Sequence, residues 1–126
     1  IIELGRKILK MACHQAVRWL DQDFSVSVNV SPVQFKDPQS FFNTVNEALV
    51  SSNLQPSRLI LEITETSIFQ NKKEALQILY QLKNSLGVRL SIDDFGAGNT
   101  SFALLNEMRS LLSIVKIDRR FIQDAV

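Results

Sequence analysis

Apolar and polar residues recur along the chain with two periods, one typical of helices and one typical of strands. From Ile1 to Leu20 the apolar residues return at helical spacing, which predicts a helix with one buried stripe. That stripe comprises Ile1, Leu4, Ile8, Ala12, Ala16 and Trp19. The segment Phe24–Val30 then alternates Val with Ser and Asn, the period of a strand. Asp37 followed by Pro38 predicts the start of a second helix, which buries Phe42, Val45 and Leu49.

The remainder of the chain repeats the order of strand and helix. The mostly apolar segment Arg58–Thr64 predicts a strand buried on both faces of a parallel sheet. A helix follows, with a capping-box spacing at Asn71 and Glu74 and a stop at Gly87. Its apolar stripe is Ala75, Leu79, Leu82 and Leu86. Then come a strand at 88–93, a helix containing Leu104, Leu105, Met108 and Leu112, and a fourth strand at 113–118.

This order of elements predicts an α/β fold. Strands separated by helices pair in parallel through right-handed crossovers. Two architectures satisfy the pattern, an open doubly wound sheet and a stretch of a (β/α)8 barrel. Both place their chemistry at the carboxyl ends of the strands.

Composition narrows the class of protein. The 126 residues are enough for one domain, and 14 Lys+Arg against 13 Asp+Glu give no basic surface for DNA or RNA. The one cysteine, Cys13, lies in a helical pattern that predicts a buried thiol, which suits the reducing cytoplasm. No apolar run approaches the roughly 18 residues needed to span a bilayer. We therefore expect a cytoplasmic domain, whose longer parent protein could still be tethered to a membrane.

Each predicted strand ends in polar groups. Asn29, Glu62, the pair Asp93–Asp94, and Lys116 with Asp118 stand at the four carboxyl ends. The period of 2 puts Asn29 on one face with Ser27, and Asp93 on one face with Ser91. Carboxylates crowded at one point repel one another unless a cation neutralises them, and oxygen ligands suit Mg²⁺ or Mn²⁺ better than Zn²⁺. We therefore expect a metal centre. The chain can turn at this strand end so that one of Asp93 and Asp94 bridges two ions and the other binds only the second. Lys116 would be a cation near a metal-bound water, where it steers the water or stabilises charge on a phosphate oxygen.

Structural roles remain open for each of these residues taken singly. Asn29 could be a turn residue, and Glu62 a buried acid paired with Arg or Lys. The Asp93–Asp94 pair could be a solvated entry to a loop or a helix N-cap. Glu65, just beyond the strand of Glu62, either supports the metal ligands or is simply exposed.

Four sequence blocks resemble a known family. "NVSPVQF", "LEITET", "DDFGAGNTSF" and "VKIDRRF", in this order and at these separations, are similar to the conserved blocks of the EAL family, bacterial phosphodiesterases that linearise cyclic di-GMP (c-di-GMP). The resemblance implies a partial (β/α)8 TIM-type barrel that hydrolyses c-di-GMP to pGpG with two Mg²⁺ or Mn²⁺ ions and is inhibited by Ca²⁺. It also implies a homodimer through the loop after Asp94, with no DNA partner, and it allows fused sensory or GGDEF domains in the parent protein.

The resemblance assigns roles to individual residues. Asn29, Glu62 and Asp93 match metal ligands, and Asp94 matches a ligand or water-holding residue on the second ion. Lys116 matches the residue that orients the attacking water. Glu65 matches an acid that braces the mobile loop "FGAGNTSF".

The chain also departs from the family pattern. The Glu-Ala-Leu motif, a substrate-binding Arg and the last strands are not in the sequence, so residues 1–126 are expected to be one partial EAL domain with little activity alone. Asn99 and Thr100 stand where an aromatic residue and Ser are common, and Leu111–Ser113 replaces a usual Pro-x-Asp. These departures motivate an alternative, a catalytically silent EAL-like receptor for c-di-GMP. A third hypothesis is an unrelated metal-dependent barrel enzyme that acts on a phosphorylated or enolisable substrate.

Overall fold

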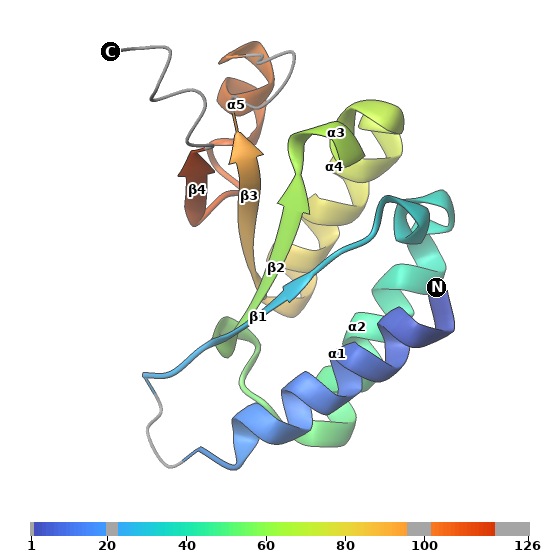
Figure 1. Cartoon of the computed structure of the whole chain (residues 1–126), viewed down its shortest axis with the longest axis vertical. Coiled ribbons are helices and arrows are strands. Elements are labelled where there is room, and N and C mark those ends of the chain that lie inside the picture. Colours follow the sequence, from blue (N-terminus) through green and yellow to red (C-terminus); the bar gives the residue numbers. More distant parts are fainter. Residues whose placement is uncertain (1, 20–22, 96–101, 118–126) are drawn as a thin grey trace.

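The computed structural model describes residues 2–19, 23–95 and 102–117 (Figure 1). Within these ranges the helices are α1 (Ile2–Val17), α2 (Pro38–Ser52), α3 (Glu65–Gln70), α4 (Lys72–Gln81) and α5 (Phe102–Met108). The strands are β1 (Val26–Asn29), β2 (Leu59–Thr64), β3 (Arg89–Phe95) and β4 (Ile114–Ile117). Short 3₁₀ turns cover Pro32–Lys36 and Pro56–Arg58, and a π-helical turn covers Leu82–Leu86.

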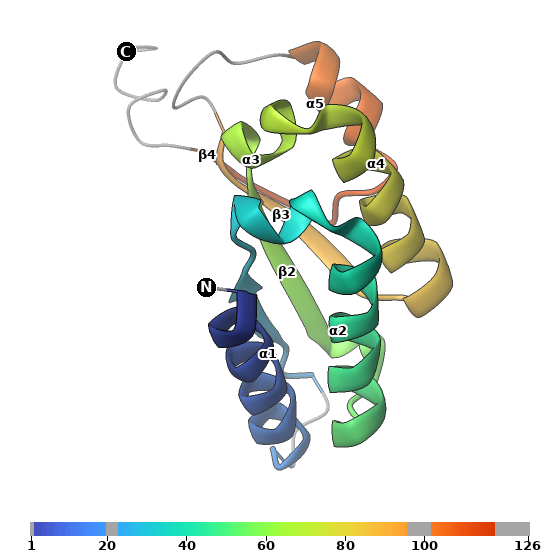
Figure 2. The ribbon, with the colours of Figure 1, turned by 90° about the vertical axis from the view of Figure 1, so that its right-hand side faces the viewer.

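The four strands form one parallel sheet in the order β1-β2-β3-β4. A doubly wound sheet reverses its strand order at a switch point, whereas consecutive strands of a barrel lie side by side in chain order. Helices α1, α2 and α4 lie on the same side of the sheet (Figure 2). The observed order therefore agrees with a stretch of a (β/α)8 barrel and not with the doubly wound alternative.

Side chains alternate between the two faces of the sheet. One face packs on the helices and carries the apolar core, which on the strands comprises Val28, Leu59, Leu61, Ile63, Leu90, Ile92 and Phe95. The opposite face, which we call the open face, carries the residues between them. Its members are Ser27, Asn29, Ile60, Glu62, Thr64, Arg89, Ser91, Asp93, Ile114 and Lys116. In a barrel this face lines the interior, and the chemistry lies at its rim, at the carboxyl ends of the strands.

Helix ends confirm two sequence predictions and overturn one. Asp37 caps α2, its carboxylate accepting the Ser40 N–H at 3.1 Å, and Gly87 adopts φ 87° where the helix stops. Asn71 makes no capping hydrogen bond through its side chain, so the predicted capping box with Glu74 is wrong. The reason is that Asn71 also ends α3, a helix that the pattern did not predict, and its N–H donates to the Ile68 carbonyl.

The predicted buried stripe of α1 is also partly wrong. Leu4 and Ile8 are 60% and 46% exposed, whereas Leu9 and Cys13 are buried. Ala16, which belonged to the predicted stripe, is buried as expected. Both stripes have helical spacing, and the buried residues of α1, which packs on α2 and β1, are Leu9, Cys13 and Ala16. Within the described ranges no helix is long and apolar enough to cross a membrane.

Candidate metal centre

The open face brings together most of the predicted site residues at one rim of the sheet. Asn29 of β1 is the register partner of Glu62 in β2, and Glu62 is the partner of Ser91 in β3. Asp93 lies two residues beyond Ser91 on the same face of β3. Neighbouring strands are about 4.8 Å apart, so these side chains leave the sheet within reach of one another.

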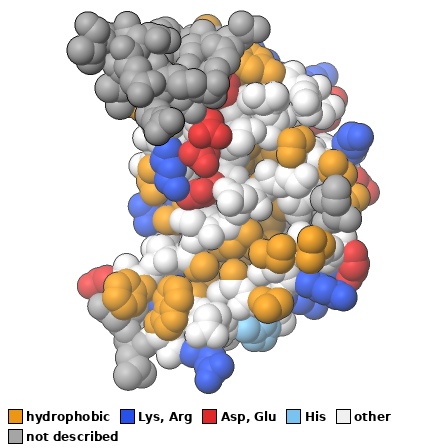
Figure 3. Space-filling model, in the orientation of Figure 1, with side chains coloured by type: hydrophobic (Ala, Val, Ile, Leu, Met, Phe, Trp, Pro, Cys, Tyr) orange, Lys and Arg blue, Asp and Glu red, His pale blue; other side chains and the backbone are white. Residues whose placement is uncertain are grey.

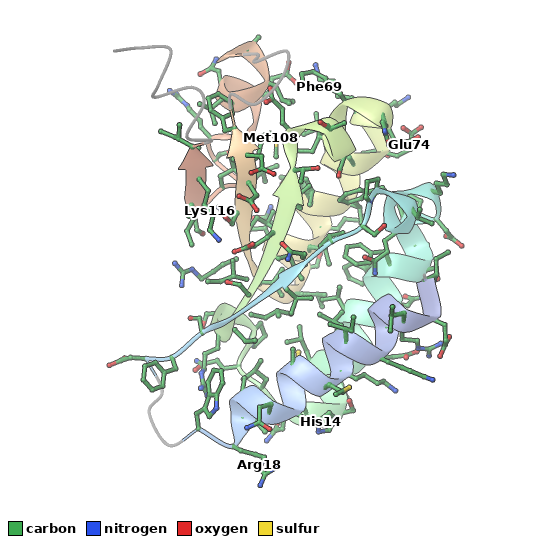
Figure 4. The ribbon with its side chains drawn as sticks, viewed as in Figure 1. His14, Arg18, Phe69, Glu74, Met108 and Lys116 are labelled. Carbon is green, nitrogen blue, oxygen red and sulfur yellow. The ribbon has the colours of Figure 1, made fainter. Side chains whose placement is uncertain are left out.

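Glu62 and Lys116 form an ion pair across the intervening strand β3. The Lys116 Nζ donates to Glu62 Oε1, although the two residues belong to β2 and β4. The Glu62 side chain is 9% exposed and that of Lys116 is 48% exposed, so the ammonium group reaches in from solvent to a carboxylate that is largely buried. Figure 4 shows Lys116 on β4, beside the strands that carry the acids.

The charge of Lys116 is stabilised by more than one acid. The hydrogen bond to Glu62 raises the pKa of the Lys116 ammonium, desolvation lowers it, and the charges of Glu62 and Asp93 raise it further, with a net shift upward. A cation therefore already lies in the field of two carboxylates. In Figure 3, acidic and basic side chains lie next to one another on this part of the surface.

A β-bulge places the two aspartates. Ile92 pairs with Val115 and Phe95 with Ile117, so β3 has one more residue than β4 over this interval. Because Ile92 and Phe95 both belong to the core, Asp93 and Asp94 are both left on the side away from it. Asp94 has φ 55°, and its N–H donates to Asp93 Oδ1 at 2.9 Å. The expectation that the chain turns at this strand end is therefore confirmed.

Glu65 does not lie free on the surface. It opens α3 and is only 5% exposed, which rules out the simple exposed role. Thr64, the partner of Asp93 in the sheet, caps the same helix by accepting the Ser67 N–H at 3.2 Å. The acid is thus held at the carboxyl end of β2, directly after the strand that carries Glu62. The loop that it is expected to brace, residues 96–101, lies outside the described residues.

The segment Leu111–Ser113, where the chain departs from the family pattern, connects α5 to β4. The Leu111 and Leu112 N–H groups donate to the Met108 carbonyl, and Ser113 N–H donates to the Leu90 carbonyl at 2.9 Å. The last bond ties the start of β4 to β3. With this connection, Lys116 of β4 is placed where its ammonium group donates to Glu62.

Several predictions concern residues that the structure does not describe. Asp118, Asn99 and Thr100 lie outside the described residues, as does the proposed dimerisation loop. On α1, His14 Nε2 lies 3.3 Å from Ser51 Oγ, and Cys13 is fully buried as predicted. Burial raises the pKa of the Cys13 thiol to about 11, so this thiol is unreactive at neutral pH.

The side-chain atoms on this rim are of the chemical type that binds a hard divalent cation. Asn29, Glu62 and Asp93 offer amide and carboxylate oxygens, and the Lys116 ammonium already acts as a cation near two of them. Within residues 2–19, 23–95 and 102–117, however, no three His, Cys, Asp or Glu side chains gather closely enough to hold a metal ion. The described residues therefore offer suitable oxygen donors at this rim but no closed cluster of acids.

Sequence reasoning noted Ser91 only as a neighbour of Asp93 on one face. The structure shows that its hydroxyl is fully buried and has no hydrogen-bond partner. In the sequence, Ser91 is marked only by its place two residues before Asp93 on one face of a strand. This place does not distinguish a functional hydroxyl from a small residue required by packing.

Comparison with known proteins gives one family. The family model described as "EAL domain" matches residues 1–126. The bifunctional diguanylate cyclase/cyclic di-GMP phosphodiesterase MucR of Pseudomonas aeruginosa is 39% identical over 127 residues, which cover 98% of this chain and 18% of that protein. The cyclic di-GMP phosphodiesterase PdeR of Escherichia coli is 30% identical, with 98% of this chain and 18% of that protein covered.

A solved structure with the same arrangement is the PaMucR phosphodiesterase in complex with c-di-GMP. It is 42% identical with a TM-score of 0.82, and the match covers 95% of this chain and 51% of that chain. The chain thus spans about half of that structure and less than a fifth of the two curated relatives.

Proposed function

The chain belongs to the EAL domain family, and from this premise we propose that it is the central part of a c-di-GMP phosphodiesterase domain. The observation that carries the proposal is the convergence of Asn29, Glu62, Asp93 and Lys116 on one rim of the open face. The proposed reaction is hydrolysis of one phosphodiester of c-di-GMP to linear pGpG, with two divalent ions, Mg²⁺ or Mn²⁺, and with Ca²⁺ as an inhibitor. The phosphodiesterase names of MucR and PdeR support this reaction.

Each residue has a proposed task that follows from its position. Asn29, Glu62 and Asp93 would hold one ion through their oxygens, and Asp93 and Asp94 would hold the second, since the bulge leaves both aspartates off the core. When bound, the ions lower the pKa of a water and offset charge on the phosphate. The exposed stem of Lys116 allows its ammonium to leave Glu62 and orient the attacking water.

The remaining ligands are proposed to come from strands of the same domain that are not in this chain, since the match covers only 51% of the PaMucR chain. On this account residues 1–126 alone release little or no pGpG. We also propose a cytoplasmic protein, fused to sensory or GGDEF domains, that forms a homodimer through the loop after Asp94. Sedimentation of the full-length protein, with and without replacement of residues 96–101, tests the dimer.

The direct test is release of pGpG from c-di-GMP by the full-length protein with Mn²⁺ or Mg²⁺. We expect release by wild type, loss of release in Glu62→Gln, and an unchanged rate in Glu74→Gln, which removes an exposed acid on α4. A correctly folded wild type that releases no pGpG with either ion would refute the proposal.

A second candidate, a silent receptor that binds c-di-GMP without hydrolysis, is favoured by one observation. The Glu62 carboxylate is engaged by the chain's own Lys116, as a buried acid in a purely structural pair would be. Calorimetry that shows tight c-di-GMP binding by a protein with no turnover would favour the receptor.

A further inference from the structure

Ser91 combines complete burial with an unpaired hydroxyl. Its exposed fraction is 0%, and in the part of the chain that the structure describes its Oγ is the buried side-chain polar atom without a hydrogen-bond partner. Buried hydroxyls are almost always paired, because an unpaired one loses its hydrogen bonds to water without replacement. An exception of this kind calls for an explanation from its surroundings.

The surroundings of Ser91 are those of the candidate metal centre. Ser91 is the register partner of Glu62, on the same open face, and Asp93 follows it by two residues on that face. Since Glu62 belongs to β2 and Lys116 to β4, the ion pair between them passes over β3, the strand of Ser91. Ser91 therefore lies on the strand that this ion pair crosses, on the same face and at the level of Glu62.

The Glu62 carboxylate has capacity for a second donor. Lys116 Nζ donates to Oε1, whereas no hydrogen bond to Oε2 is found in the described structure. A carboxylate that binds a metal through one oxygen is commonly oriented by a hydrogen bond to the other. Ser91, one strand away on the same face, is placed to supply that bond.

We propose that Ser91 is a positioning residue, whose O–H donates to Glu62 and fixes its carboxylate when a divalent ion replaces the Lys116 ammonium. This inference rests on the proposed function. In the structure without metal the Glu62 carboxylate accepts its hydrogen bond from Lys116, and the Ser91 hydroxyl has no hydrogen-bond partner. With an ion bound, the Glu62 carboxylate would no longer pair with Lys116 and would accept a charge-assisted hydrogen bond from the Ser91 hydroxyl.

The test compares Mn²⁺ affinity with metal-free stability in the full-length protein. In Ser91→Ala we expect Mn²⁺ binding, measured by calorimetry, to weaken by about tenfold, the order found for partners of metal ligands. We expect the thermal midpoint without metal to stay equal or rise, because the variant removes an unpaired buried hydroxyl. Ser91→Thr, which restores the hydroxyl, should recover most of the affinity. Ser27→Ala, an exposed serine on the open face of β1, is the matched control and should change neither quantity.

The outcomes are distinguishable. Wild-type Mn²⁺ affinity in Ser91→Ala, or a loss of affinity matched by an equal loss of metal-free stability, would overturn the role of Ser91 and leave the proposed function standing. Absence of Mn²⁺ binding in the folded wild type would overturn both.

Discussion

The backbone at Asp94 allows its charge and its conformation to be tested separately. Asp94 is exposed and has φ 55° in the bulge of β3. The left-handed region costs most residues about 1–2 kcal/mol, and Asp and Asn less, because their short side chains form local hydrogen bonds. Asp94→Asn should therefore leave the free energy of unfolding nearly unchanged, while Asp94→Ala should lower it by about 1 kcal/mol. Asp94→Gly removes the strain but gains unfolded-state entropy of about 0.4–1 kcal/mol, so its net change is small.

The functional effect of the same three variants should not follow their stability. If Asp94 holds the second ion, then Asn, Ala and Gly all remove its carboxylate. A residue that only supports a metal ligand typically costs about 10–100-fold in activity when it is replaced. Each of the three variants should lower Mn²⁺-dependent pGpG release by more than that. Urea unfolding of the chain measures the first effect and pGpG release by the full-length protein the second. An Asp94→Asn variant with near wild-type activity would refute the metal role, and equal stability of the Ala and Asn variants would refute the strain argument.

Three further variants test other parts of the account. Lys116→Met keeps the aliphatic stem but removes the ammonium group that pairs with Glu62. Calorimetry should show tighter Mn²⁺ binding, and the pGpG assay should show loss of release. An unchanged Mn²⁺ affinity would mean that the lysine does not compete with the ion. Burial raises the pKa of Cys13 from 9.0 to about 11, so the neutral thiol stabilises the fold fully below pH 9 and this contribution is lost as the pH rises toward 11. Between pH 9 and 11 the urea midpoint of wild type should therefore fall further than that of Cys13→Ala. The same fall in both proteins would refute this role of the thiol. The Arg58 guanidinium donates hydrogen bonds to the Phe24 and Ala16 carbonyls, and a hydrogen bond from a charged donor contributes about 1.5–3 kcal/mol. Arg58→Met should therefore lower the free energy of unfolding, measured in urea, by about 3 kcal/mol. A change below about 1 kcal/mol would show that these bonds contribute little.

The sequence predicted the strands well because each is marked by valine, leucine or isoleucine at the period of a sheet. It also predicted the polar strand ends, since Asn29, Glu62 and Asp93 interrupt apolar runs where a core would not accept them. The parallel order of the strands decided between the barrel and the doubly wound sheet, and this could not be read from the pattern. Strand order depends on which edges meet in space, and local periodicity does not record it.

The fine geometry of the site was less accessible. Helix α3 was missed because Glu65–Gln70 is short and follows the strand without a break. The helical stripe of α1 was misassigned, since Leu4 and Ile8 have the same spacing as the residues that α2 covers. The pair of Glu62 and Lys116 joins side chains 54 positions apart across a third strand, and only the sheet register reveals it.

The central claim is that this rim of the sheet holds divalent ions through Asn29, Glu62 and Asp93. The most direct measurement is an anomalous difference map from crystals of the full-length protein grown with Mn²⁺. We expect a peak within coordination distance of the Glu62 and Asp93 carboxylates and the Asn29 amide oxygen, with Lys116 no longer bonded to Glu62. A map with no manganese at this rim and the Glu62–Lys116 ion pair intact would contradict the account.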